Sequence, residues 1–124
     1  IALNLIRIFF TLNFYKKMIS QDLIKLAQNT KFYGLKKLFT HMSKYKNRKC
    51  GDTISLQLIT KKNKILSMRY ETNSCIFCQA SASLLANSIN AFKKNDVSTD
   101  IKIINSFFKN NENKLPKRLN ISER

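Results

Sequence analysis

Two short runs of alternating apolar and polar residues constrain the fold of this chain more than any other feature. TISLQLIT (53–60) and ILSMRYET (65–72) both alternate, which is typical of strands with one buried face. The intervening KKNK suits a tight connection, in which Asn63 can adopt the left-handed conformation. The pattern predicts an antiparallel hairpin whose apolar face needs a cover. The expected buried side chains are Ile54, Leu56, Leu58, Leu66, Met68 and Tyr70.

The residues after the hairpin can supply this cover. Residues 76–93 (IFCQASASLLANSINAFK) have the helical period, and the small residues at 80–83 would let the helix approach another backbone closely. Its expected apolar side is formed by Ala80, Ala82, Leu84, Leu85, Ile89 and Phe92. Residues 98–109 predict a second helix, with Ser98 and Thr99 as capping candidates. Its expected stripe is Ile101, Ile104 and Phe108.

The residues before the hairpin complete the expected fold. Residues 20–28 suit a short amphipathic helix with Ser20 as its cap and Leu23, Ile24 and Ala27 on one face. Residues 41–48 alternate weakly and predict an edge strand guarded by lysines. Strands followed by helices indicate an α+β fold, in which an antiparallel sheet packs against helices.

The charge of the chain invites a nucleic-acid interpretation. The 124 residues form one domain's worth of sequence, with a formal net charge of +16. The basic residues are spread along the whole chain, however, and no recognition-helix, zinc-finger or RNA-binding pattern accompanies them. We therefore expect solvated lysines and no nucleic-acid partner, although a basic surface would attract an acidic protein. No hydrolase or kinase motif occurs either, so we expect a protein that is not an enzyme.

The two ends of the chain are interpreted separately. Residues 1–17 are apolar but too short and interrupted to span a membrane, so we expect no membrane partner. Met18 begins a plausible domain, and residues 1–17 are interpreted as an N-terminal extension, translated from upstream sequence. The domain is expected to cover residues 18–124. LPKRLNISER ends without a closing element, which suggests truncation at the C-terminus.

Three cysteines carry the chemical signal. Cys50 and Asp52 lie in a turn just before the first hairpin strand, whereas Cys75 and Cys78 follow the second. In an antiparallel hairpin these two strand ends are neighbours, roughly 5 to 10 Å apart. A helix N-terminus favours the thiolate, which is the form that binds metal. Three cysteines do not suggest a secreted disulfide framework, and we expect a reducing, cytoplasmic location.

Each of these residues also has a simpler interpretation. Cys78 could be a small buried apolar residue, and Asp52 could be only a turn residue. His41 is interpreted as an edge-strand or surface histidine. Cys50 and Cys75, at paired strand ends, are harder to explain by packing alone. Sulfur ligands with one oxygen ligand suit zinc or an iron–sulfur unit.

The paired motifs resemble those of a known family. CGD at 50–52, followed by a hairpin and by SC-x-x-x-Q-A-S-A-S-L-L at 74–85, is similar to the NifU/IscU/SufU scaffolds. LPKR at 115–118 resembles the Pro-x-Arg before that family's third cysteine. The resemblance covers about residues 20–122. It implies a three-stranded antiparallel sheet backed by helices, an IscU/SufE-like fold.

The resemblance also implies a function. Family members receive sulfur from a cysteine desulfurase, build a transient iron–sulfur cluster and pass it to acceptor apo-proteins. It implies Cys50, Asp52 and Cys75 as cluster or iron ligands. Two departures stand out: Ser74 replaces a glycine, and Ile121 occupies the place of the third cysteine. We expect Cys78, one helical turn from Cys75, to substitute as a metal ligand, with His41 as a weaker candidate.

Three functional hypotheses follow. The first is an iron–sulfur cluster assembly scaffold. The second is a thiol or persulfide sulfur-relay protein, with or without structural zinc. The third, least favoured, is a basic nucleic-acid-binding domain.

Overall fold

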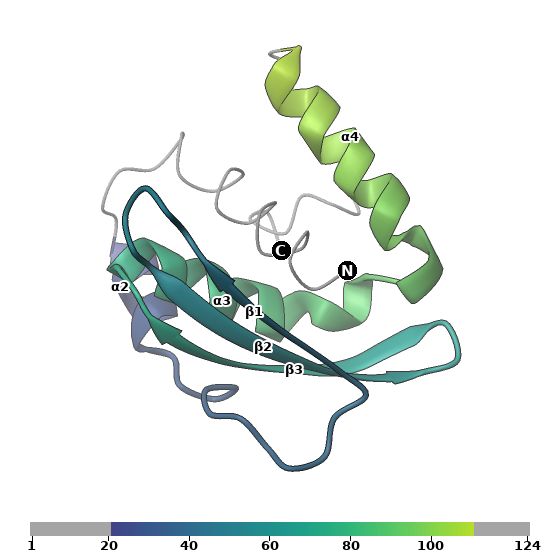
Figure 1. Cartoon of the computed structure of the whole chain (residues 1–124), viewed down its shortest axis with the longest axis horizontal. Coiled ribbons are helices and arrows are strands. Elements are labelled where there is room, and N and C mark those ends of the chain that lie inside the picture. The colour runs from purple at the N-terminus through teal and green to yellow at the C-terminus, as the bar shows by residue number, and fades with distance from the viewer. Residues whose placement is uncertain (1–20, 111–124) are drawn as a thin grey trace.

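The alternating segments form the predicted sheet. A computed structural model of the chain describes residues 21–110 (Figure 1). The strands and helices in chain order are α2 (Gln21–Gln28), β1 (His41–Lys46), β2 (Thr53–Lys61), β3 (Lys64–Asn73), α3 (Ile76–Ser88), the short 3-10 helices η1 (Ile89–Ala91) and η2 (Lys94–Asp96), and α4 (Val97–Lys109). The three strands are antiparallel in the order β1-β2-β3, so the α+β fold class is confirmed.

One face of the sheet carries the core. Leu56 and Leu58 of β2 and Met68 of β3 are almost fully buried, and they pack with Leu85 of α3. Figure 1 shows α3 running along this face, with α2 beside its start. Because the first turns of α3 are rich in alanine and serine, the helix can lie close to its neighbours, as the sequence predicted. The buried residues of α3 are Cys78, Ala80, Ser81, Ala82, Ser83, Leu85 and Ala86.

The hairpin departs from strict alternation near its tip. The register shifts between Ile59 and Thr60, which is a β-bulge. As a result Ile65 is buried, whereas Leu66 is 46% exposed. The prediction that Leu66 belongs to the buried face was therefore wrong.

The turn between β2 and β3 also differs from the prediction. Lys62 adopts the positive φ of 53°, and Asn63 does not. Asn63 instead bonds the segment that follows η1: its carbonyl accepts from the Lys94 N–H at 3.0 Å and its Oδ1 from the Asn95 N–H at 2.7 Å. Asn63 therefore links the hairpin tip to residues 94 and 95 by hydrogen bonds.

The helix after the hairpin is shorter than predicted. It ends at Ser88, a 3-10 turn follows, and Phe92 has extended backbone angles. Phe92 is buried in the core, and Lys93 pairs with Lys64 in an isolated antiparallel bridge. The backbone at Phe92 and Lys93 is therefore extended, whereas the periodicity predicted a helix there.

The other two helices, α4 and α2, differ from the predictions in their capping and in one buried residue. Asp96 occupies the N-cap position of α4, so Ser98 and Thr99 lie inside the helix and do not cap it. In α2 Leu23 is buried as expected, but Ile24 is 38% exposed. Ser20, the predicted cap of that helix, lies outside the described residues, as does the side chain of Phe108.

The second face of the sheet is partly covered by the segment between α2 and β1. Figure 1 shows this segment on the side of the sheet away from α3. Arg69 donates from Nε to the Gly34 carbonyl at 2.8 Å and from a terminal nitrogen to the Tyr33 carbonyl at 2.6 Å. The Gln57 side chain accepts from the Lys36 N–H at 2.8 Å and donates to the Lys36 carbonyl at 2.9 Å. These bonds fix the segment across the middle of the sheet.

Candidate metal and sulfur site

A closed turn between β1 and β2 holds Cys50. The Asn47 N–H donates to the Asp52 carbonyl at 2.8 Å, and the Asn47 carbonyl accepts from the Gly51 N–H at 2.8 Å. The Asn47 side chain accepts from the Lys49 N–H at 2.9 Å. Gly51 has φ +79°, a conformation that glycine adopts without a steric penalty. The turn therefore fixes the backbone on both sides of the Cys50 thiol.

Sequence reasoning singled out Cys50, Gly51 and Asp52 but missed Asn47. An asparagine whose side chain bonds the backbone two residues later forms an Asx turn, and this is a recognisable signal ahead of a glycine.

Cys75 lies where β3 gives way to α3. The strand ends at Asn73, and Cys75 occupies the N-cap position of α3 with extended backbone angles. Thr53 at the start of β2 is the register partner of Asn73. The two cysteine-bearing segments therefore meet at one end of the sheet, and the predicted neighbourhood of these strand ends is confirmed.

Asp52 connects the two segments. Its Oδ2 accepts a hydrogen bond from the Cys75 N–H at 3.3 Å. The first turn of α3 contains no acidic residue, and the Cys75 side chain makes no capping bond. A carboxylate near a helix N-terminus is favoured by the exposed N–H groups and by the helix dipole. Asp52 supplies that carboxylate from the turn that precedes β2.

The three thiols have different environments. Cys50 and Cys75 are exposed, whereas Cys78 is 1% exposed and belongs to the core cluster. The pKa of the Cys78 thiol is raised from 9.0 to about 11, mainly by burial; a hydrogen bond with Ser74 opposes the rise, and the nearby Asp52, Cys75 and Cys50 contribute to it. Cys78 thus lies behind the two exposed thiols but faces the core. Its burial favours the packing interpretation, and its role as a metal ligand stays a prediction.

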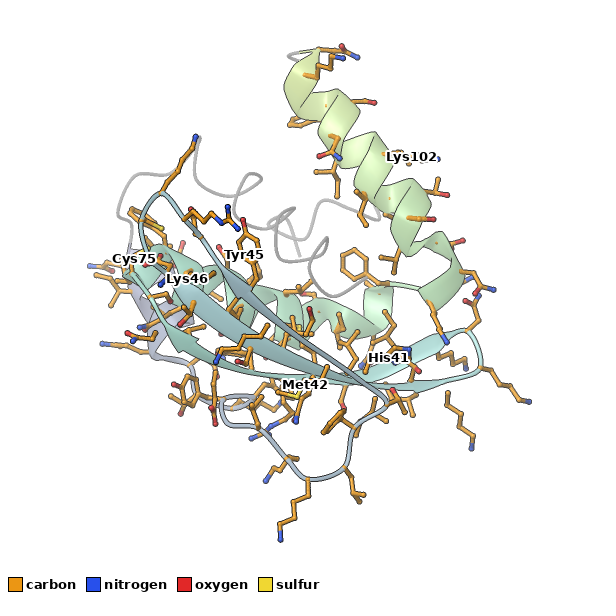
Figure 2. The ribbon with its side chains drawn as sticks, in the orientation of Figure 1. His41, Met42, Tyr45, Lys46, Cys75 and Lys102 are labelled. Carbon is orange, nitrogen blue, oxygen red and sulfur yellow. The ribbon has the colours of Figure 1, made fainter. Side chains whose placement is uncertain are left out.

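The described residues do not by themselves present a complete metal site. Between residues 21 and 110, no group of three His, Cys, Asp or Glu side chains is arranged to hold a metal ion. His41 begins β1 at the opposite end of the sheet from Cys75, as Figure 2 shows, and its Nδ1 lies 3.0 Å from the Thr40 hydroxyl. It does not join the cysteines. Ile121 and the LPKR motif lie outside the described residues.

Within residues 21–110, every helix is too short or too polar to cross a bilayer.

Comparisons with known proteins agree with this arrangement. The family described as NifU-like N terminal domain matches residues 18–119. The iron–sulfur cluster assembly scaffold protein IscU of Thermotoga maritima is 33% identical over 75 residues, which are 60% of this chain and 53% of that protein. The aligned region thus spans about half the length of this curated relative.

Two solved structures share the fold. The N-terminal domain of a nitrogen-fixing NifU-like protein from Brucella abortus superposes with a TM-score of 0.70 at 16% identity, covering 84% of this chain and 72% of that one. A putative iron–sulfur cluster assembly scaffold protein for the SUF system from Fervidobacterium islandicum AW-1 gives a TM-score of 0.69 at 21% identity, covering 85% and 79%. The IscU-like fold is therefore confirmed. Because the family match spans most of its length, this chain belongs to the NifU-like N-terminal domain family.

Proposed function

We propose that this protein is an iron–sulfur cluster assembly scaffold, which binds iron or a nascent cluster on Cys50 and Cys75 and passes it to acceptor proteins. One observation carries the proposal. The segments that carry the exposed cysteines Cys50 and Cys75 meet at one end of the sheet, and a hydrogen bond from the Cys75 N–H to the Asp52 carboxylate joins them. Family membership and the name of the Thermotoga relative support the same role.

The chemistry of the site suits a transient cargo. Thiolates are the ligands that iron–sulfur units prefer, and exposed thiols can be reached by a donor and by an acceptor. Asp52 would add an oxygen ligand, which binds soft metal more weakly than sulfur does and so keeps the cargo labile. A remaining coordination position would be filled by sulfide or by a partner's thiolate.

The finer assignments belong to the same proposal. A cysteine desulfurase would supply sulfur, and acceptor apo-proteins would take the finished cluster, in the cytoplasm. Iron is the expected metal, and zinc is the alternative. The protein would hold and transfer its cargo without catalysing a reaction of its own.

A sulfur-relay protein is the second candidate. The observation in its favour is that Cys50 is exposed on a rigid turn, where it could accept persulfide sulfur alone. In that case Cys75 would be dispensable for sulfur transfer, whereas a scaffold needs both thiols.

Anaerobic reconstitution of the full chain separates these functions. With ferrous iron and sulfide, a scaffold acquires the visible absorption of an iron–sulfur cluster and loses it to an added apo-ferredoxin. A relay protein instead takes a persulfide label from a desulfurase and develops no chromophore. Retention on DNA that falls steeply with salt, without either result, would identify a nucleic-acid-binding protein and overturn the proposal.

A further inference from the structure

The face of the sheet away from α3 is uncovered near the hairpin tip. The bonds of Arg69 and Gln57 hold the α2–β1 segment across the middle of this face. Beyond them Ile59 is 37% and Leu66 46% exposed, because the β-bulge turns Leu66 out of the core. Met42, the β1 partner of Gln57, is 48% exposed (Figure 2). These three side chains form the apolar patch.

Lysines surround the tip next to this patch. Lys61, Lys62 and Lys64 come from the hairpin and are exposed. The Lys64–Lys93 bridge and the bonds from Asn63 bring Lys93 and Lys94 to the same end, although they are about thirty residues away in sequence. These five residues are the tip lysines. Asp96 is the one acidic residue in the segments 61–64 and 93–96.

We propose that the apolar patch and the tip lysines together form a docking surface for an acidic, amphipathic segment of a partner protein. Leucine-like side chains of the partner would cover Ile59 and Leu66, and its carboxylates would face the tip lysines. The surface lies at the other end of the hairpin from Cys50 and Cys75, so a docked partner would leave the thiols accessible.

The charge of the chain disfavours two other occupants. A second copy of this protein would bring another net charge of +16 against the tip lysines, which repels it. A nucleic-acid backbone would satisfy the lysines but would gain nothing from Met42, Ile59 and Leu66, because phosphates stay hydrated. An acidic amphipathic protein segment matches both halves of the surface.

Titration of the isotopically labelled full chain with a synthetic peptide tests the proposal. The peptide carries leucines on one helical face and glutamates on the other, and a polyglutamate peptide of equal length is the comparison. At physiological salt the amphipathic peptide should shift backbone NMR signals near residues 59–66 and 93–94. Leu66→Ser should weaken its binding about tenfold, because the burial of one leucine is lost.

Matched variants outside the docking surface test whether binding of the peptide depends on these particular residues. Ile24→Ser removes an apolar side chain of similar exposure on α2 and should leave binding unchanged. Lys61→Glu with Lys64→Glu should abolish binding, whereas Lys25→Glu with Lys102→Glu, which changes net charge equally, should not. Cys50→Ser should also bind normally, so this result is independent of the cluster-binding proposal.

Several results would overturn the docking surface. Polyglutamate binding as tightly as the amphipathic peptide would show attraction by charge alone. An equal loss of peptide binding in the Lys61→Glu, Lys64→Glu variant and in the Lys25→Glu, Lys102→Glu variant would show that net charge matters and the position of the lysines does not. Tighter binding of duplex DNA to the same residues would assign a nucleic-acid site, and a dimer in ultracentrifugation that Leu66→Ser dissociates would assign a self-association surface.

Discussion

Cys75 and Cys78 are three residues apart but lie in opposite environments. Cys75 is exposed at the start of α3, whereas Cys78 is buried in the core behind it. A buried thiol that stays protonated is a poor nucleophile and a poor metal ligand, because binding requires the thiolate. At the scale of single residues, the difference in burial separates two accessible thiols from a third whose surroundings favour a packing role.

The raised pKa of Cys78 makes stability depend on pH. In the unfolded chain the thiol loses its proton near pH 9.0, but in the folded protein it does so only near pH 11. Its contribution is therefore fully present below pH 9 and is lost as pH rises through 11, because the unfolded state loses its proton first. This rise in the pKa corresponds to about 2 to 3 kcal/mol of the free energy of unfolding.

Urea unfolding between pH 8 and pH 11 measures this dependence. The wild type should lose more stability than Cys78→Ala over that range, because only the wild type carries the buried thiol. Lysines and tyrosines titrate in both proteins and cancel in the comparison. Parallel pH profiles would show that the Cys78 thiol ionises freely in the folded protein.

At the scale of secondary structure, α3 depends on a residue from the turn between β1 and β2. Asp52 accepts from the Cys75 N–H, and the first turn of the helix contains no acid of its own. Asp52→Ala should lower the free energy of unfolding by about 1 kcal/mol, since a helix N-terminus loses its acceptor. Asp52→Asn should lose less, because an amide oxygen can still accept.

Chemical denaturation of the full chain checks this role. Asp22→Ala, which removes an exposed acid in the first turn of α2, is the control for a general effect of charge. If Asp52→Ala unfolds at the same denaturant concentration as the wild type, Asp52 does not stabilise α3.

Sequence patterns predicted which elements form better than where they end. Alternation predicted β2 because Ile54, Leu56 and Leu58 face the core, and periodicity predicted that α3 is a helix. It did not predict that residues 80–83 of α3 are all buried. The misplaced details all depend on tertiary contacts. Leu66 is exposed because of a bulge in strand register, and α3 stops at Ser88 because Phe92 and Lys93 contact the core and the hairpin.

The candidate site was predictable to a similar degree. The meeting of the segments that carry Cys50 and Cys75 follows from antiparallel pairing, which the sequence indicates directly. The orientation of Cys78 does not follow, because the i, i+3 spacing fits either a shared ligand face or a shared packing face. The burial of Cys78 in the core cluster favours the packing face, and that burial depends on the assembled fold.

At the scale of the whole molecule, the family match begins at residue 18. We predict that residues 1–17 are dispensable for folding and for metal binding, because they lie outside the matched family domain. A chain that starts at Met18 should show the same circular dichroism and the same unfolding midpoint as the full chain. Failure of the shorter chain to fold would show that the N-terminal extension stabilises the domain.

Iron and sulfide content after anaerobic reconstitution tests the central claim most directly. Wild type, Cys50→Ser and Cys75→Ser are compared after gel filtration removes unbound metal, with Cys78→Ala as the matched control. The account predicts that either serine variant loses nearly all retained iron, because a serine hydroxyl is a poor ligand for soft metal, whereas Cys78→Ala retains it. Unchanged iron content in both serine variants would contradict a site shared by Cys50 and Cys75.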